Sequence, residues 1–440
     1  MKRLILALSV LLASASAAAA QQTPAGVGLS GPPVVTFVEA GRLLADPSNG
    51  VVQRSKTLVI SGNQVVDIRD GFVGDPAQGR VIDLRDSFVL PGLIDSHVHL
   101  TGQQNPNSRL EEVTQSEAAQ AMVGARYARR TLMAGFTTVQ DVGGNMEAVR
   151  ALRAGVEAGE FPGPRMRIAG GAVTPTGGHA DINGWSVEVM RANGSPYACN
   201  GADDCARAVR QLVQEGADVI KITATGGVLS STGAGVEQQF FQEELDAIVG
   251  AAHMMGRKVT AHAHGVTGIN AFLRAGGDSI EHGTYLDRES IRLFRDNDAV
   301  LVPTVMAGEW VANQADAGWM TPFQAAKARV VGPLMLEMVR RAHEGGVTIA
   351  FGTDSGVSAH GDNAREFLLY TMAGMTEMEA LATATTVGAR HVQLEDEIGR
   401  IAPGFSADIV ATNGDPLENI EELMDIDFVM ARGVVHKNEE

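Results

Sequence analysis

The middle of the chain, roughly residues 91 to 400, alternates short apolar runs with longer amphipathic stretches. Short apolar runs bounded by turn residues predict buried strands, and apolar positions spaced three or four apart predict helices. The predicted strands are Leu93–His99, Thr137–Asp141, Arg165–Ala169, Val219–Thr223, Val259–Ala263, Ser279–His282, Val300–Pro303 and Thr348–Asp354. The predicted helices between them include Ser116–Met133, Met146–Ala158, Asp203–Glu215, Phe241–Met255 and Gln324–Glu344. Eight strands alternating with helices predict an α/β fold, a parallel (β/α)8 TIM-like barrel with its active site at the C-terminal strand ends.

The two ends of the chain share a different, purely β-type pattern. Short runs at Val34–Val38, Thr57–Ile60, Gln64–Ile68 and Arg80–Leu84 are separated by Gly, Asn and Asp, as turns require. Similar runs return at residues 407–411 and 428–435. We therefore expect residues 34–90 plus 401–440 to form a small β-sandwich domain, and residues 91–400 to form the barrel.

The first residues have the pattern of a secretory signal peptide. Met1-Lys2-Arg3 precedes an apolar run that ends at Leu12, and small residues continue to Ala20. The apolar run is too short to span a bilayer. We expect a signal peptide over residues 1–20, cleavage after Ala20, and a flexible leader over residues 21–33. The protein is then periplasmic or secreted.

Composition narrows the range of partners. The chain has 440 residues, of which 45% are hydrophobic, as in an ordinary globular protein. Its net charge of -17 argues against nucleic acid or an anionic membrane as a partner. The two cysteines, Cys199 and Cys205, lie close together in a polar segment, and in an exported protein we expect them to form a local disulfide.

Polar residues stand at the ends of several predicted strands. Because side chains alternate along a strand, His97 and His99 share one face and suit a metal ion. Lys221 is centred in an apolar strand, where an unpaired charge is costly. Further strand-end residues are His262, His264, His282 and Asp354. Each alone is compatible with a core histidine or a helix-capping aspartate, but together they predict a metal site.

These motifs resemble those of the amidohydrolase superfamily, in its binuclear-metal branch. The resemblance extends from Val34 to Lys437 and rests on Pro91–His99, Gly216–Ile222, Gly352–Asp354 and Gly399–Val410. The segments Thr174–Asp181 and Thr225–Ser230 are similar to loops of the imidazolonepropionase-like and prolidase-type (Xaa-Pro dipeptidase) group. That group includes bacterial amidohydrolases that cleave ochratoxin A.

The resemblance implies two divalent metal ions per chain, usually zinc, bridged by a hydroxide. The implied metal ligands are His97, His99 and Asp354 for the first ion, His262 and His282 for the second, and a carboxylated Lys221 that bridges both. Two metals lower the pKa of the bound water and polarise the substrate carbonyl. Asp354, Lys221 and His282 are the implied catalytic residues, with Asp354 moving the proton to the leaving amine.

Other residues near the strand ends are candidates for substrate binding. His179, His264 and His360 each follow a predicted strand in a Gly-rich context, although ordinary loop histidines occur in such places too. Val228 and Leu229 begin a loop of small and apolar residues that suits a bulky neutral group. We expect these five side chains to contact substrate.

The leading hypothesis is a binuclear zinc amidohydrolase that uses the metal-bridging hydroxide to cleave the amide bond before a C-terminal amino acid. Its substrate would be a dipeptide, an N-acyl amino acid or an ochratoxin A-like conjugate. One alternative is hydrolysis of a cyclic amide or a lactone at the same site. Another is a pseudoenzyme that uses the barrel as a binding scaffold, which the complete set of six ligands disfavours. We expect a small-molecule partner, no nucleic acid, no membrane, and a homo-oligomer.

Overall fold

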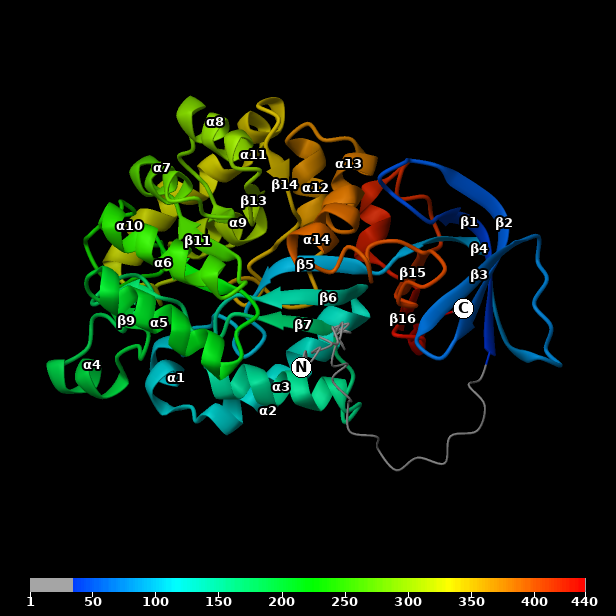
Figure 1. Cartoon of the computed structure of the whole chain (residues 1–440), viewed down its shortest axis with the longest axis horizontal. Helices are drawn as coiled ribbons and strands as arrows, with labels where there is room; N and C mark the ends of the chain where they lie inside the picture. The colour runs from blue at the N-terminus through cyan, green and yellow to red at the C-terminus, as the bar shows by residue number, and fades with distance from the viewer. Residues whose placement is uncertain (1–34, 440) are drawn as a thin grey trace, which may run out of the picture. The chain divides into compact units, whose positions relative to one another are not determined.

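Eight parallel strands run through the middle of the chain in the computed structural model, which describes residues 35–439 (Figure 1). They form two sheets, with strand orders β5-β6-β7 and β10-β11-β12-β13-β14. The strands are β5 (Leu93–Val98), β6 (Phe136–Asp141), β7 (Arg165–Ile168), β10 (Ile220–Thr223), β11 (Val259–Ala263), β12 (Ser279–His282), β13 (Val300–Val302) and β14 (Thr348–Ile349). All eight predicted strands are therefore present.

Backbone hydrogen bonds cross both gaps between these two sheets. At one gap Ser96 N donates to Phe351 O over 2.9 Å, and at the other Asp218 N donates to Ile168 O over 2.8 Å. Strand β14 is shorter than expected because Phe351 N donates to Thr383 O rather than to a neighbouring strand. The structure confirms the α/β class and the parallel strands, but the strand ladder is not continuous around a closed barrel.

Both ends of the described chain contribute to one seven-stranded sheet, in the order β17-β16-β15-β4-β1-β2-β3. Figure 1 shows β15 and β16, from the C-terminal part, beside β4. Val65 N donates to Phe405 O over 3.0 Å, so the edge strand β3 also contacts the segment before β15. The strands are β1 (Val35–Leu44), β2 (Val52–Ser61), β3 (Gln64–Asp70), β4 (Gly79–Pro91), β15 (Ile409–Thr412), β16 (Phe428–Ala431) and β17 (Val434–Asn438).

Helices fill the connections between the parallel strands, as the amphipathic pattern predicts. Helix α2 begins after Ser116, whose side chain accepts from Ala119 N and satisfies a free helix-end donor. The α-helices are α1 (Ser108–Thr114), α2 (Glu117–Met133), α3 (Met146–Glu157), α4 (Val187–Asn193), α5 (Ala202–Glu215), α6 (Gln242–Met254), α7 (Val266–Arg274), α8 (Arg288–Asp296), α9 (Val305–Gln314), α10 (Pro322–Val331), α11 (Met335–Glu344), α12 (Arg365–Met372), α13 (Glu377–Thr383) and α14 (Thr386–His391). Minor elements are the 3-10 helices η1 (Gly332–Leu334) and η2 (Ile420–Met424), and the short strands β8 (Thr174–Pro175) and β9 (Ala198–Cys199).

One helix prediction is wrong. The stretch 324–344 is not a single helix, because η1 separates α10 from α11. Pro333 lacks the backbone N–H that a continuous helix needs. Gly332 packs so closely on α9 that an added Cβ would lie 2.4 Å from Gly308 O. The break turns α10 into a separate helix.

The predicted disulfide is confirmed. Cys199 of β9 and Cys205 of α5 are bonded, with their Cα atoms 5.0 Å apart, and both are fully buried. The bond ties the short strand to the start of the helix that leads into β10.

The predicted signal peptide, its cleavage after Ala20 and the leader lie outside the described residues. Among the described helices, none has both the length and the apolar character needed to cross a bilayer.

Candidate active site

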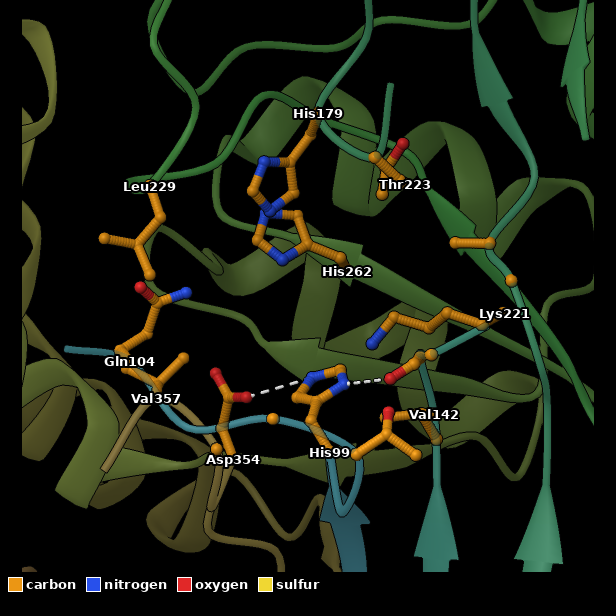
Figure 2. Close-up of a pocket in the computed structure, with 18 of the residues that line it drawn as sticks. His99, Gln104, Val142, His179, Lys221, Thr223, Leu229, His262, Asp354 and Val357 are labelled. Atoms are coloured by element: carbon orange, nitrogen blue, oxygen red, sulfur yellow. Dashed lines mark hydrogen bonds and ion pairs between the residues drawn. The ribbon is translucent and has the colours of Figure 1, made fainter. Parts of the chain in front are cut away.

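A cavity of about 830 Å³ collects the polar ends of the parallel strands (Figure 2). It brings together side chains that are far apart in sequence, such as His97 and Asp354, which are 257 positions apart. Ten of the eleven predicted site residues line it: His97, His99, His179, Lys221, Val228, Leu229, His262, His264, His282 and Asp354. The predicted set is therefore one site in space, as expected for the C-terminal ends of parallel strands.

Three hydrogen-bond acceptors meet on the floor of this cavity. His97 Nδ1 donates to Glu281 Oε2 over 2.6 Å, and His99 Nδ1 donates to Gly143 O over 2.7 Å. In a neutral imidazole the other nitrogen, Nε2, then carries a lone pair. These two Nε2 atoms lie 3.4 Å and 3.1 Å from Asp354 Oδ1 (the His99 contacts are dashed in Figure 2). Acceptors facing one another without a hydrogen between them fit a bound cation.

The surroundings of Asp354 support this interpretation. Its Oδ1 is buried and has no hydrogen-bond partner among the described residues. The donor set is two imidazoles and one carboxylate, which suits zinc and similar divalent ions.

A second cluster of imidazoles adjoins the first. The ligand nitrogens of His262, His264 and His282 lie within 4.8 Å of one another, and His282 also belongs to the group formed with His97 and Asp354. Burial lowers the pKa of His262 and His282 well below the ordinary value, and that of His264 to about 4. These rings are neutral at neutral pH, which metal binding requires. His264, predicted to contact substrate, lies as close to this cluster as the predicted ligands do.

Lys221 enters the same floor from β10. The residue is only 4% exposed, and among the described residues no carboxylate oxygen lies within 4.0 Å of its Nζ. Burial lowers its pKa. An unpaired ammonium in this position is unfavourable, and burial shifts the equilibrium toward the neutral amine.

Two of the predicted residues have an unusual backbone. His282 and Asp354 have φ values of 72° and 55°, in the left-handed region that side chains other than glycine seldom adopt. Thr304, with φ 55°, places its Oγ1 2.6 Å from His282 Nδ1. Strained residues of this kind persist where surrounding contacts impose them, and they gather at functional sites.

Glu281 is a residue of this site for which the sequence analysis above predicts no role. It is fully buried and accepts from His97 Nδ1, and Thr260 Oγ1 donates to its other oxygen. Burial would raise its pKa, but His97 lowers it below the usual value. Its contacts set the tautomer and orientation of His97. A glutamate inside a buried strand was the available signal, since buried carboxylates need partners.

His360 does not line the cavity, which corrects the prediction that it contacts substrate. Its ring stacks on Tyr127 with centroids 4.4 Å apart, and its Nε2 donates to Gly102 O over 2.9 Å. Gly102 and the next two residues do line the cavity. His360 therefore lies outside the cavity and contacts the backbone of the segment after β5 that lines it.

The outer part of the cavity has a different charge from its floor. Lys221 is the single lysine or arginine among the lining residues. The lining glutamates are Glu111, Glu112, Glu117, Glu147 and Glu215. A negatively charged group of a substrate is therefore disfavoured near these side chains.

Comparisons with known proteins agree with this geometry. The model of the amidohydrolase family matches residues 88–435. The chain is 31% identical over 428 residues to ochratoxinase from Aspergillus niger, covering 91% of this chain and 86% of that protein.

The chain is also similar to solved structures of peptide-bond hydrolases over most of its length. A Xaa-Pro dipeptidase with methionine bound in its active site is 39% identical, with a TM-score of 0.87, covering 92% of this chain and 100% of that one. A prolidase in complex with N-methylphosphonate-L-proline is 31% identical, with a TM-score of 0.83 and the same two coverages.

Proposed function

The chain belongs to the amidohydrolase family and is a hydrolase that acts on amide or peptide bonds, and we propose that it is a binuclear zinc enzyme that cleaves the amide before a C-terminal amino acid. The observation that carries this proposal is the cavity floor. There the Nε2 atoms of His97 and His99 face Asp354 Oδ1, and a second imidazole cluster adjoins them.

The residues present fit two metal ions. His97, His99 and Asp354 would hold the first, and His262 and His282 would hold the second. Lys221 would bridge both after its neutral amine has added carbon dioxide, with loss of one proton, to give a carbamate. This reaction would turn a buried amine that lacks an ion-pair partner into an anion that two cations can hold, so that no lone charge is buried. His264 adjoins the second cluster and is a candidate for an additional ligand or for contact with substrate.

Bound at these residues, the two metal ions would supply an activated water and a polarised amide carbonyl. Asp354 is the group on this floor that would accept a proton from the attacking water and return it to the leaving amine nitrogen. Glu281 and Gly143 O hold the rings of His97 and His99 in one tautomer, so that the acceptor atoms are in place before substrate binds.

The proposed substrate joins a bulky acyl group to an amino acid with a free carboxylate. Imidazoles and backbone amides would bind this carboxylate, because no arginine is among the lining residues. Val228 and Leu229 form an apolar part of the wall that suits the acyl group. The likeness to ochratoxinase and to Xaa-Pro dipeptidases supports both parts of this proposal.

We further propose that the two parallel sheets are arcs of one barrel, since hydrogen bonds cross both gaps, and that the seven-stranded sheet curls into a sandwich. Export with cleavage after Ala20 and a homo-oligomeric state complete the proposal. N-terminal sequencing of the mature protein and light scattering test these two points.

A hydrolysis screen with zinc-loaded protein tests the function. Dipeptides, N-acyl amino acids and ochratoxin A are compared with the methyl ester of each turned-over compound. The free acids should react about 10–100-fold faster, because an ester loses one charge-assisted hydrogen bond. Equal rates would show that the carboxylate is not bound. Turnover restricted to lactones or cyclic amides would favour the alternative activity.

A further inference from the structure

One wall of the cavity is a loop that follows β10. Its Val228 and Leu229 line the cavity, and Ser230 Oγ lies 2.5 Å from His179 Nδ1. Three consecutive residues thus supply two apolar side chains and the partner of a cavity histidine. Figure 2 shows Leu229 and His179 entering the cavity from this side. The position of this loop decides the shape of the wall.

Two side chains of helix α10 hold the loop by its backbone. Lys327 Nζ donates to Gly227 O over 2.6 Å and to Ser230 O over 2.9 Å. Gln324 Nε2 donates to Leu229 O over 2.5 Å. Lys327 is half-buried, and its described neighbours offer it carbonyl oxygens but no carboxylate within 4.0 Å. The loop carbonyl oxygens therefore stabilise the half-buried ammonium, and the ammonium in turn holds the loop backbone in place.

The loop and the histidine are also in direct contact. A Cβ added at Gly227 would lie 2.2 Å from the ring of His179. That ring in turn packs on His262, with centroids 4.2 Å apart. A shift of the loop backbone must therefore move His179, next to a predicted metal ligand.

We propose that Lys327 is a positioning residue for the specificity wall of this cavity. Its ammonium fixes the loop 227–232 so that Ser230 orients His179 and so that Val228 and Leu229 present one apolar surface to the acyl group of the substrate. This inference rests on the proposed function, because it concerns the same cavity.

The charge of Lys327 gives this arrangement a pH dependence. Burial lowers the pKa of Lys327 to about 8. The titratable groups that face it are His179 and His264, whose pKa values are lowered by burial and by the charge of Lys327. Both rings stay neutral above pH 7, so the lysine alone changes its charge near pH 8. The loop should therefore loosen in alkaline solution, whereas an arginine at position 327 keeps its charge.

Hydrogen exchange measured by mass spectrometry tests the inference without using activity. In Lys327→Met, amides of residues 226–236 should exchange about 10–100-fold faster, since bonds to a charged group are lost. Lys327→Arg should stay near wild type. The matched control is Arg329→Met, which removes a cation from an exposed position of the same helix. At pH 9.5, after correction for intrinsic exchange, the loop amides of wild-type protein should exchange as fast as those of Lys327→Met. The loop amides of Lys327→Arg should stay slow at this pH.

Kinetics then separates positioning from general stability. Lys327→Met should raise KM about 10-fold for substrates with a bulky acyl group, with metal content unchanged. Gln324→Ala, which keeps the lysine, should give a smaller change of the same kind. Unchanged exchange in the loop, or faster exchange spread over the whole chain, would overturn the inference. A wild-type protein without amidase activity would refute the proposed function but leave the exchange result to decide the role of Lys327.

Discussion

Two groups of histidines in this chain differ in what their rings face. On the cavity floor, His97 and His99 donate through Nδ1 and direct Nε2 at Asp354. Away from it, His360 stacks on Tyr127, and His391 Nε2 accepts from the amide of Gln140 over 3.4 Å.

The comparison teaches that burial of a histidine does not identify a metal ligand. His97 and His264 of the cavity floor are buried, and so are His360 and His391. Burial lowers the pKa of His264, His360 and His391 alike, to about 4. What distinguishes the floor is the convergence of several acceptor atoms on one point. The substitutions predicted below remove or weaken this cluster of acceptor atoms, or change histidines that lie outside it.

The largest effect is expected for Asp354→Asn. The amide keeps the volume but loses the negative charge that faces both imidazoles, so activity should fall on the order of 10⁴-fold and metal content should drop by at least one ion per chain. Elemental analysis and turnover measure both. Asp298→Asn is a matched control, because Asp298 is exposed and also has a left-handed backbone. Full metal content in Asp354→Asn would contradict the assignment.

Lys221 tests the bridge between the two clusters. Lys221→Ala should lose activity at least about 1,000-fold, and a short carboxylic acid should restore part of it by taking the place of the carbamate. Lys221→Arg should stay inactive, because a guanidinium remains cationic and does not add carbon dioxide. An active Lys221→Arg enzyme would show that no carbamate is needed.

Glu281 tests whether metal binding at the floor depends on the hydrogen bond that orients His97. Glu281→Gln keeps the shape but offers His97 Nδ1 a weaker, neutral acceptor, so metal affinity should fall about 10–100-fold. Competition with a chelator measures this change. The variant should fold normally, which circular dichroism checks. An unchanged affinity would mean that Glu281 serves packing alone.

His391 tests a buried histidine outside the cavity through acid stability. Burial lowers its pKa from 6.5 to about 4 in the folded chain. Between these two values the unfolded chain binds a proton that the folded chain does not, so stability falls as pH falls through this window, by at most about 1.4 kcal/mol per pH unit. In His391→Gln, which keeps an acceptor for Gln140, urea unfolding should show a correspondingly shallower slope. If the unfolding free energy of both proteins changed with pH in the same way, the lowered pKa of His391 would be refuted.

The smallest effect is expected for His360→Phe. The phenyl ring keeps the stacking on Tyr127 but loses the hydrogen bond to Gly102 O, which should cost about 1 kcal/mol of unfolding free energy. Metal content should not change, and KM for amide substrates should stay near wild type. A strong rise in KM, without loss of stability, would return His360 to the substrate-binding residues.

Local periodicity explains why much of the fold and floor was predictable. Each of the eight strands is a short segment between longer amphipathic stretches, and the alternation of side chains along β5 is enough to place His97 and His99 on one face. The failures have local causes too. Pro333 and Gly332 divide an otherwise helical pattern, and His360 has the same Gly-rich context as histidines that do reach the cavity.

The sequence by itself determined the order of strands and helices, the sheet contributed by both ends, the disulfide and the residue types at the strand ends. These follow from polarity and spacing along the chain. Tertiary structure alone decided which acceptors face one another, that Glu281 holds His97, that Lys327 holds the loop beside His179, and that His360 lies behind the cavity. The reason is that each of these contacts joins residues about 100 or more positions apart, and their geometry depends on how whole elements pack.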